Sequence, residues 1–315
     1  SVNAFAQTQD GSLWVGTDDG LNRLRPGEEN FEWINESTYP SIPNPDVMSL
    51  LAVDNQLWVG TFSGGLTILN IDSGDVVTYK HNPKDVHSIG ANGITSMIQT
   101  SDGTVLVGTF GGGLSVYQPE SQNFISLKNI RGNKSSLSNN KVIALYQDSL
   151  GMIWVGTEKG LNRFELSDYS FETFHSDINN PDSISSDTAW AFYEDGKGQL
   201  WIGTRGSGLE RWDAADRASS RNYFHHFSEI ISLPSSNIYG IRSDESGNLW
   251  LSHNRGITKF KPDTSETNHF GVKDGLQDSE FNMGAAFKGV SGTIYFGGNR
   301  GFNMIPAQGT QSQTI

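Results

Sequence analysis

"LWVGTDDGLNRL", residues 13–24, reads as a short strand, a tight turn and a second strand. The chain repeats this pattern, and further copies begin at Leu57, Val105, Ile153, Leu200, Leu249 and Ile294. One residue in each strand marks the repeat, and these markers, spaced 44 to 49 residues apart, are Gly16, Gly60, Gly108, Gly156, Gly203, Ser252 and Gly297. A period of roughly 40–50 residues is typical of four-stranded propeller blades.

One repeat, residues 139–176, shows what a blade contains. Its apolar stretches predict four strands, at 142–146, 153–157, 161–166 and 171–174. Gly, Asp, Asn and Ser fill the connections, as tight turns require. Each repeat is therefore predicted to be an antiparallel meander of four strands, with almost no helix.

Two columns of the repeat indicate how the blades pack. Five of the eight tryptophans occupy one position, two residues before the marker: Trp14, Trp58, Trp154, Trp201 and Trp250. The third position of each predicted inner strand is always small: Ala4, Ser49, Ser96, Ala144, Ala191, Gly240 and Ala286. A small residue inside a strand indicates close approach of another backbone. We therefore predict an all-β, closed, seven-bladed propeller in which residues 1–315 form one domain.

The last repeat is shorter than the others. Strands at 284–287, 294–298 and 302–305 leave its outermost strand without an obvious sequence. We expect this blade to have three strands, or a weak fourth strand from residues 310–315. We also expect the full protein to supply the missing strand from residues upstream of Ser1.

Composition excludes several classes of protein. The 315 residues include no cysteine, so disulfides and Cys-based zinc sites are absent. No run of 18 apolar residues could span a membrane, so any membrane segment would lie outside residues 1–315. The net charge of −13 opposes the phosphate attraction on which nucleic-acid binding depends, so we expect no nucleic-acid partner.

Local motifs give no catalytic or cofactor site. The glycine-rich "GTFGGGL" at 108–114 runs into a strand, whereas a phosphate loop runs into a helix. His225 and His226 are adjacent, so they point to opposite faces of a strand, and His253 reads as a drifted turn residue. We therefore expect no catalytic residue, no metal site and no cofactor.

The repeated block and the segment "GLQDSEFNMGAAFKGVSGTIYFGGNRGFNMIPA" at 275–307 closely resemble the two-component regulator propeller family. The resemblance covers the whole chain, although Leu106 replaces a repeat tryptophan and Ser252-His253 replaces Gly-Thr. It implies an extracytoplasmic, periplasmic sensor of a hybrid histidine kinase or diguanylate cyclase. It also implies an oligosaccharide or other small polar ligand, and we expect a homodimer in the full receptor.

A ligand is expected on the face that carries the linkers into the inner strands and the turns after the marker residues. This linker face is predicted to present the following candidate residues: Asp19, Phe62, Phe110, Lys159, Arg205, Arg255, Arg300, Trp190 and Tyr239. Aromatic faces suit sugars, and arginine forks suit carboxylates or sulfates. The plainer interpretation is that the two inner-strand aromatics pack between blades and the arginines are solvated. At the level of function, a propeller lyase or hydrolase acting on a glycan or lactone and a protein-interaction or dimerisation scaffold are the alternatives to a non-enzymatic sensor.

Overall fold

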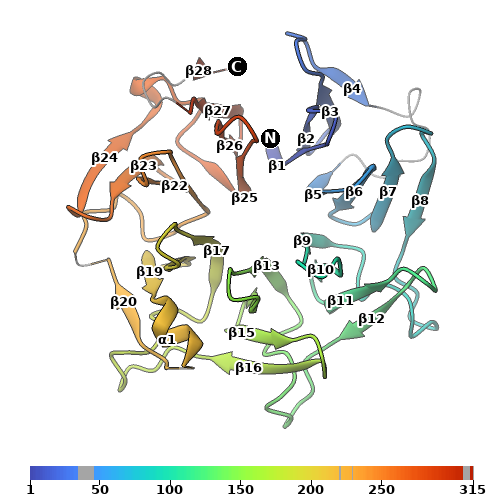
Figure 1. The fold of residues 1–315 in the computed structure, drawn as a ribbon, viewed down its shortest axis with the longest axis horizontal. Coiled ribbons are helices and arrows are strands. Elements are labelled where there is room, and N and C mark those ends of the chain that lie inside the picture. Colours follow the sequence, from blue (N-terminus) through green and yellow to red (C-terminus); the bar gives the residue numbers. More distant parts are fainter. Residues whose placement is uncertain (35–45, 220, 229, 308–312, 315) are drawn as a thin grey trace.

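The computed structural model describes residues 1–34, 46–219, 221–228, 230–307 and 313–314. Seven four-stranded sheets surround a central opening (Figure 1), and no connection within a sheet crosses another strand. The predicted seven-bladed, all-β propeller of antiparallel meanders is confirmed. The first and last blades lie side by side, so the ring is closed (Figure 1).

The strands follow the repeat. Blade one contains β1 (Val2–Gln7), β2 (Leu13–Thr17), β3 (Gly20–Leu24) and β4 (Glu32–Ile34). Blade two contains β5 (Val47–Val53), β6 (Gln56–Thr61), β7 (Leu66–Asn70) and β8 (Val76–Tyr79). Blade three contains β9 (Ile94–Gln99), β10 (Val105–Thr109), β11 (Gly113–Gln118) and β12 (Asn123–Leu127). Blade four contains β13 (Val142–Gln147), β14 (Ile153–Thr157), β15 (Gly160–Glu165) and β16 (Ser170–Phe174).

The later blades are less regular. Blade five contains β17 (Ala189–Glu194), β18 (Leu200–Thr204), β19 (Leu209–Trp212), the short helix α1 (Ala214–Ala218) and β20 (Phe224–His226). Blade six contains β21 (Gly240–Ser243), β22 (Leu249–His253), β23 (Gly256–Lys261) and β24 (Glu266–Phe270), and the 3₁₀ turn η1 (Val272–Asp274) follows it. Blade seven contains β25 (Phe281–Lys288), β26 (Ile294–Gly298), β27 (Gly301–Ile305) and β28 (Gln313–Thr314). Among the described residues, no helix combines the length and apolar character needed to cross a membrane.

The marker glycines explain how neighbouring blades fit together. A Cβ on Gly16 would lie 2.5 Å from Cγ1 of Val47, the first residue of the next inner strand. A Cβ on Gly297, in the last blade, would lie 2.6 Å from the backbone oxygen of Val2 in the first blade. The close approach that requires glycine therefore recurs across the junction between blades seven and one.

Side chains also join these two blades. Asn282 Nδ2 donates a hydrogen bond to the Val2 oxygen at 2.8 Å, and Gln7 Oε1 accepts one from the Val290 amide at 3.0 Å. The rings of Phe5 and Phe302 meet edge to face, with their centroids 5.5 Å apart. Polar contacts and aromatic packing together hold the ring closed.

The repeated tryptophans pack between sheets, and they also explain why aspartate occurs in the turn between the first and second strands of a blade. Trp154 is fully buried, and its Nε1 donates to Asp148 Oδ2 at 2.9 Å. Trp201 makes the same bond to Asp195, also at 2.9 Å. A buried indole N–H needs such a partner. The aspartate in these turns therefore serves the core of the blade.

Blade seven corrects one detail of the predicted alignment. Ala286 lies opposite Phe296, so Ala285, not Ala286, occupies the small position facing Gly297. The register shift between Phe281 and Ala286 displaces this strand by one residue. The predicted weak completion is confirmed, because three full strands are followed by β28, which pairs only with Asn303 and Met304. That residues upstream of Ser1 supply an outer strand stays a prediction.

Candidate ligand-binding site

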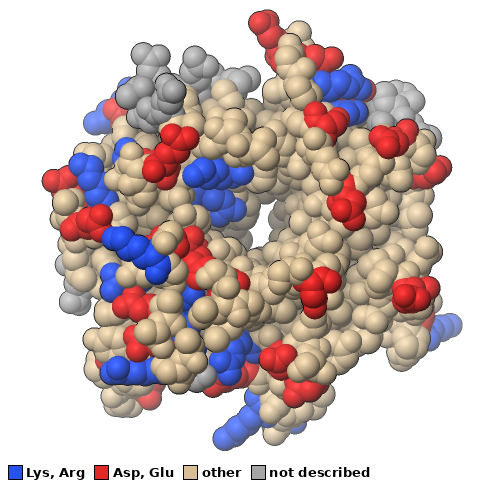
Figure 2. All heavy atoms as spheres, viewed as in Figure 1, with Lys and Arg blue, Asp and Glu red and all other residues tan. Residues whose placement is uncertain are grey.

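A central channel of about 600 Å³ runs between the inner strands. All seven blades contribute to its wall, and Figure 2 shows its opening in the space-filling view. The small column forms its waist, where Ala4, Ser49, Ser96 and Ala144 line the channel. Each inner strand starts at the linker face and ends at the opposite face, which we call the turn face. The channel therefore has a linker-end mouth and a turn-end mouth.

An irregularity in the inner strands sets which side chains line the channel. In blades one to five the ladder to the second strand skips the second residue of the inner strand. In blade five, Ala189 pairs with Thr204 and Ala191 with Gly203, so Trp190 is left without a partner. Such a bulge redirects a side chain. Trp190 lines the channel, as do Met48, Thr95 and Ile143, the residues skipped in blades two, three and four.

Three of the predicted residues gather at the linker-end mouth. The rings of Trp190 and Tyr239 meet with centroids 5.3 Å apart and planes inclined by 46°. The Arg205 guanidinium lies over the Trp190 ring, 5.8 Å from its centroid. Both aromatic side chains are half-buried and Arg205 is exposed, so the cluster is accessible from outside. Trp190 is therefore not packed wholly between blades.

A fourth residue completes this cluster. The Tyr239 hydroxyl donates to Glu280 Oε1 at 3.3 Å. Burial raises the pKa of Tyr239, the Glu280 carboxylate raises it further, and Arg205 opposes the rise. The sequence reasoning missed Glu280, although it immediately precedes the inner strand of blade seven and therefore lies at the linker face. We call Trp190, Arg205, Tyr239 and Glu280 the aromatic cluster.

The remaining predicted residues lie on separate turns. Phe62 and Phe110 are 54% and 44% exposed, and the Lys141 ammonium lies 4.7 Å from the Phe110 ring centroid. Arg300 forms a long ion pair with Asp278 at 3.5 Å. The exposed residues Asp19, Lys159 and Arg255 occupy other turns of this face. Among the described residues, no contact joins any of these six to the aromatic cluster.

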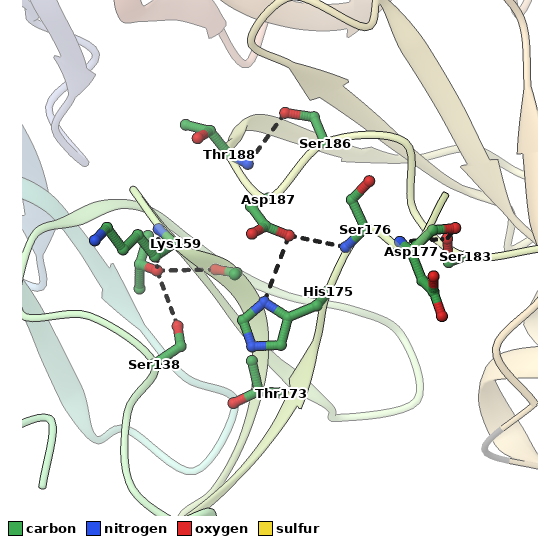
Figure 3. A network of polar contacts seen from close by, with 12 residues as sticks. Ser138, Lys159, Thr173, His175, Ser176, Asp177, Ser183, Ser186, Asp187 and Thr188 are labelled. Carbon is green, nitrogen blue, oxygen red and sulfur yellow. Dashed lines mark hydrogen bonds and ion pairs between the residues drawn. The ribbon is translucent and has the colours of Figure 1, made fainter. Parts of the chain in front are cut away.

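The linker into β17 is held by its own polar groups (Figure 3). Asp187 Oδ1 accepts from the Ser176 amide at 2.8 Å and lies 3.4 Å from His175 Nδ1. Lys159 comes from the neighbouring turn and extends away from this pair (Figure 3). The same arrangement recurs one blade earlier, where Asn140 Oδ1 accepts from the Asn129 amide. These bonds fix the linker that leads directly to Trp190.

His253 is the last residue of β22, and its side chain holds the turn that follows. It is fully buried, its Nδ1 accepts from the Arg255 amide at 3.1 Å, and its Nε2 bonds the Thr258 hydroxyl at 2.9 Å. In blade four, the Thr157 hydroxyl accepts from the Lys159 amide in the same way. Burial lowers the pKa of His253 to about 4, so the imidazole is neutral at pH 7.

One group of side chains has the composition of a metal site. Potential ligand atoms of Asp213, Asp216 and His225 lie within 4.8 Å of one another. Arg211 Nε already pairs with Asp213 at 2.8 Å, and Arg221 lies 3.7 Å from Asp216. Because two arginines neutralise these carboxylates, the charge that would attract a cation is largely compensated. We assign no metal to this group.

Comparisons with known proteins agree with the repeat pattern. The sequence model of the two-component regulator propeller matches residues 1–19, 136–159, 183–206 and 232–255. Histidine kinase P4 of Formosa agariphila is 33% identical over 64 residues, which are 20% of this chain and 5% of that protein. The chain therefore matches only a small part of this relative.

Solved structures share the fold. The extracellular domain of BT3049 from B. thetaiotaomicron, described as a hybrid two-component system, superposes with a TM-score of 0.78 at 21% identity, over 97% of this chain and 40% of that one. Virginiamycin B lyase from Staphylococcus aureus gives 0.70 at 13% identity, over 96% of this chain and 92% of that one. At these identities the likeness establishes the fold alone. The four matching segments confirm the predicted resemblance to the two-component regulator propeller family.

Proposed function

We propose that this chain is a non-enzymatic sensory domain that binds an oligosaccharide at the linker-end mouth of its channel. The aromatic cluster is the observation that carries this proposal. Two inclined aromatic faces offer a surface for the C–H faces of a sugar ring, while a guanidinium and a carboxylate beside them offer hydrogen bonds to its hydroxyls. No catalytic role is proposed for the domain.

Arg205 favours an acidic sugar within this class. Its guanidinium makes no ion pair with a described carboxylate, and its contact is with the face of Trp190. A uronate or sulfate could bind its exposed N–H groups in a bidentate manner. An oligosaccharide containing uronic acid is therefore the proposed ligand.

The family supports a place for the domain in a signalling receptor. The relatives include a histidine kinase and the extracellular domain of a protein described as a hybrid two-component system. We propose that this propeller is the periplasmic part of such a receptor and that the receptor works as a homodimer. The output would be a histidine kinase or diguanylate cyclase outside residues 1–315. The likeness to a lyase is one of fold, and it supports no reaction here.

Ligand screening tests the proposal. Neutral and uronic di- to tetrasaccharides are added in a thermal-shift assay, and binders are measured by calorimetry. A hundredfold excess over Kd should stabilise the protein by roughly 2.7 kcal/mol. Arg205→Gln should weaken the binding of uronic saccharides by about tenfold, which corresponds to about 1.4 kcal/mol, and should leave the affinity for neutral saccharides nearly unchanged.

Lys159→Gln is the matched control, because Lys159 lies on the same face outside the aromatic cluster. This substitution should change the Kd of neither class of saccharide by more than about twofold, because Lys159 is expected to make no direct contact with the ligand. Equal losses in both variants would show that only general charge attracts the ligand. The absence of any saccharide binder would favour a protein-interaction scaffold instead.

A further inference from the structure

The turn-end mouth of the channel carries a second cluster, of residues that no repeat column singles out. Tyr146, Tyr193, Arg242 and Lys288 come from the inner strands of four consecutive blades, and all four line the channel. Lys288 is the last residue of its strand, and each of the other three is the last but one. They therefore lie at the mouth opposite Trp190. We call these four residues the basic mouth.

Neither cation in the basic mouth has an acidic partner among the described residues. Arg242 donates only to the backbone oxygens of Ile241 at 2.6 Å and Ala286 at 2.5 Å. Lys288 Nζ donates to the Ser243 oxygen at 2.8 Å. These bonds leave several N–H groups of both side chains without a protein partner.

The acidic side chain at the end of the neighbouring inner strand of blade five is already engaged. Glu194, at the end of the blade-five inner strand, forms a buried ion pair with Arg217 and accepts a hydrogen bond from the Ser149 amide at 2.7 Å. The groups that act electrostatically on Arg242 are the phenols of Tyr146 and Tyr193. The two positive charges are therefore uncompensated within the mouth.

Holding neighbouring blades together does not require these charges. At the strand position of Lys288, Gln7 accepts from the Val290 amide at 3.0 Å and Gln147 accepts from the Ser101 amide at 2.7 Å. At the position of Arg242, blades one to five carry only uncharged side chains. Neutral amides thus make the contact between blades elsewhere in the ring. Two unpaired cations in a chain of net charge −13 are consequently not explained by structure alone. Figure 2 shows Lys and Arg atoms beside the central opening.

We propose that the basic mouth is a second binding site, which takes a small oxyanion such as phosphate, sulfate or a carboxylate. Arg242 and Lys288, on the adjacent inner strands of blades six and seven, supply charge-assisted hydrogen bonds to it. The Tyr146 oxygen accepts from the Glu194 amide at 3.1 Å, so the phenol hydrogen is free to donate to the anion.

The electrostatic cost of holding Arg242 in the channel wall supports this assignment. Burial lowers the pKa of Arg242, which means that its surroundings disfavour the positive charge. An anion beside the guanidinium would offset that cost. The site is independent of the proposed saccharide site, because the two mouths share no residue and face opposite sides of the ring.

Calorimetry with inorganic phosphate and with sulfate, at constant ionic strength, tests this inference. The wild-type protein should bind one anion per chain saturably. Lys288→Gln keeps a hydrogen-bond donor for Ser243 but removes the charge, and it should weaken binding at least tenfold. Lys159→Gln, on the other face, should change it less than twofold. Trp190→Ala should also leave it unchanged, which separates this site from the saccharide site.

Two results would overturn the proposal. One is an absence of saturable binding of both anions by the wild-type protein. The other is an equal loss in Lys288→Gln and Lys159→Gln, which would show diffuse attraction by surface charge. An anomalous peak between Arg242 and Lys288 in bromide-soaked crystals would support the site directly, and its absence from Lys288→Gln crystals would confirm the role of the lysine.

Discussion

Blades two and three, which we call the regular blades, line the channel with aliphatic and small polar side chains, whereas blades five and six, the irregular blades, line it mainly with aromatic side chains and an arginine. At the second inner-strand position, blades two and three carry Met48 and Thr95, whereas blades five and six carry Trp190 and Tyr239. The small column persists in all of them, because closure of the ring requires it. The regular blades thus show what the fold needs, and the irregular blades show where residues are free to serve another purpose.

Among the described residues, blade five and blade six bury charged side chains, whereas blades two and three bury none. Arg217 on α1 is 1% exposed and lies between blades four and five, where its Nε bonds Asp148 at 3.0 Å and its Nη2 bonds Glu194. Its remaining donors reach the backbone oxygens of Gly198 and Trp212 at 3.0 and 2.9 Å. Each donor and carboxylate in this network has a partner, which is the condition for tolerating buried charge.

Removing Arg217 should cause a large loss of stability. Arg217→Ala leaves Asp148 and Glu194 buried without their cation, so the free energy of unfolding should fall by about 3–5 kcal/mol. Urea unfolding followed by tryptophan fluorescence measures it. Arg131→Ala, at an exposed site, is the control and should stay within about 0.5 kcal/mol of wild type. A loss below about 1 kcal/mol in Arg217→Ala would show that the network is incidental.

His253 should make the fold sensitive to acid. Its folded pKa of about 4 lies below the ordinary value of 6.5, so the unfolded chain takes up a proton first as the pH falls. Stability should therefore be lost between about pH 6.5 and pH 4, by on the order of 3 kcal/mol in total. His253→Thr restores the residue found in the regular blades, and its unfolding free energy should vary less over this range. If the unfolding free energy of the wild type and of His253→Thr varied with pH in the same way, the lowered pKa of His253 would be contradicted.

His226 should act in the opposite direction and more weakly. Its Nδ1 lies 2.5 Å from the buried Glu210 carboxylate, which raises the pKa of His226 to about 9 against the opposing effect of burial. The stabilisation is complete below about pH 6.5 and is lost as the pH rises through about 9. Because the imidazole is about one-third exposed, solvent screening keeps the effect small. An NMR titration that places this imidazole near its ordinary pKa would contradict the ion pair.

The sequence predicts the regular part of the molecule well, because repetition reveals positions that serve packing. The marker glycines, the buried tryptophans and the antiparallel meander all follow from such columns. The alignment failed by one residue in blade seven, where a register shift between Phe281 and Ala286 lengthens the inner strand. Such a register shift leaves the types of residue in the strand unchanged, so the repeat pattern of the sequence does not reveal it.

The candidate site was harder to predict, because its members are the residues that break the repeat. Trp190 and Tyr239 stood out as departures from the second inner-strand position, Arg205 was one of the variable turn residues, and the structure brings these three together. Glu280 lies in a linker with no column to depart from, and Arg217 lies in a helix that is inserted into blade five. Their partners are set by the closed ring, which no local stretch of sequence describes.

The comparison between Trp190→Ala and Met48→Ala tests the central claim most directly. Both residues occupy the skipped position of an inner strand and line the channel, but only Trp190 belongs to the aromatic cluster. Calorimetry with the tightest-binding uronic oligosaccharide should show at least a tenfold weaker affinity for Trp190→Ala and little change for Met48→Ala. Urea unfolding should show similar, modest losses of stability in both variants. Equal binding by the two variants, or a Trp190→Ala protein that loses several kcal/mol of stability and no affinity, would contradict the account by showing that Trp190 serves packing alone.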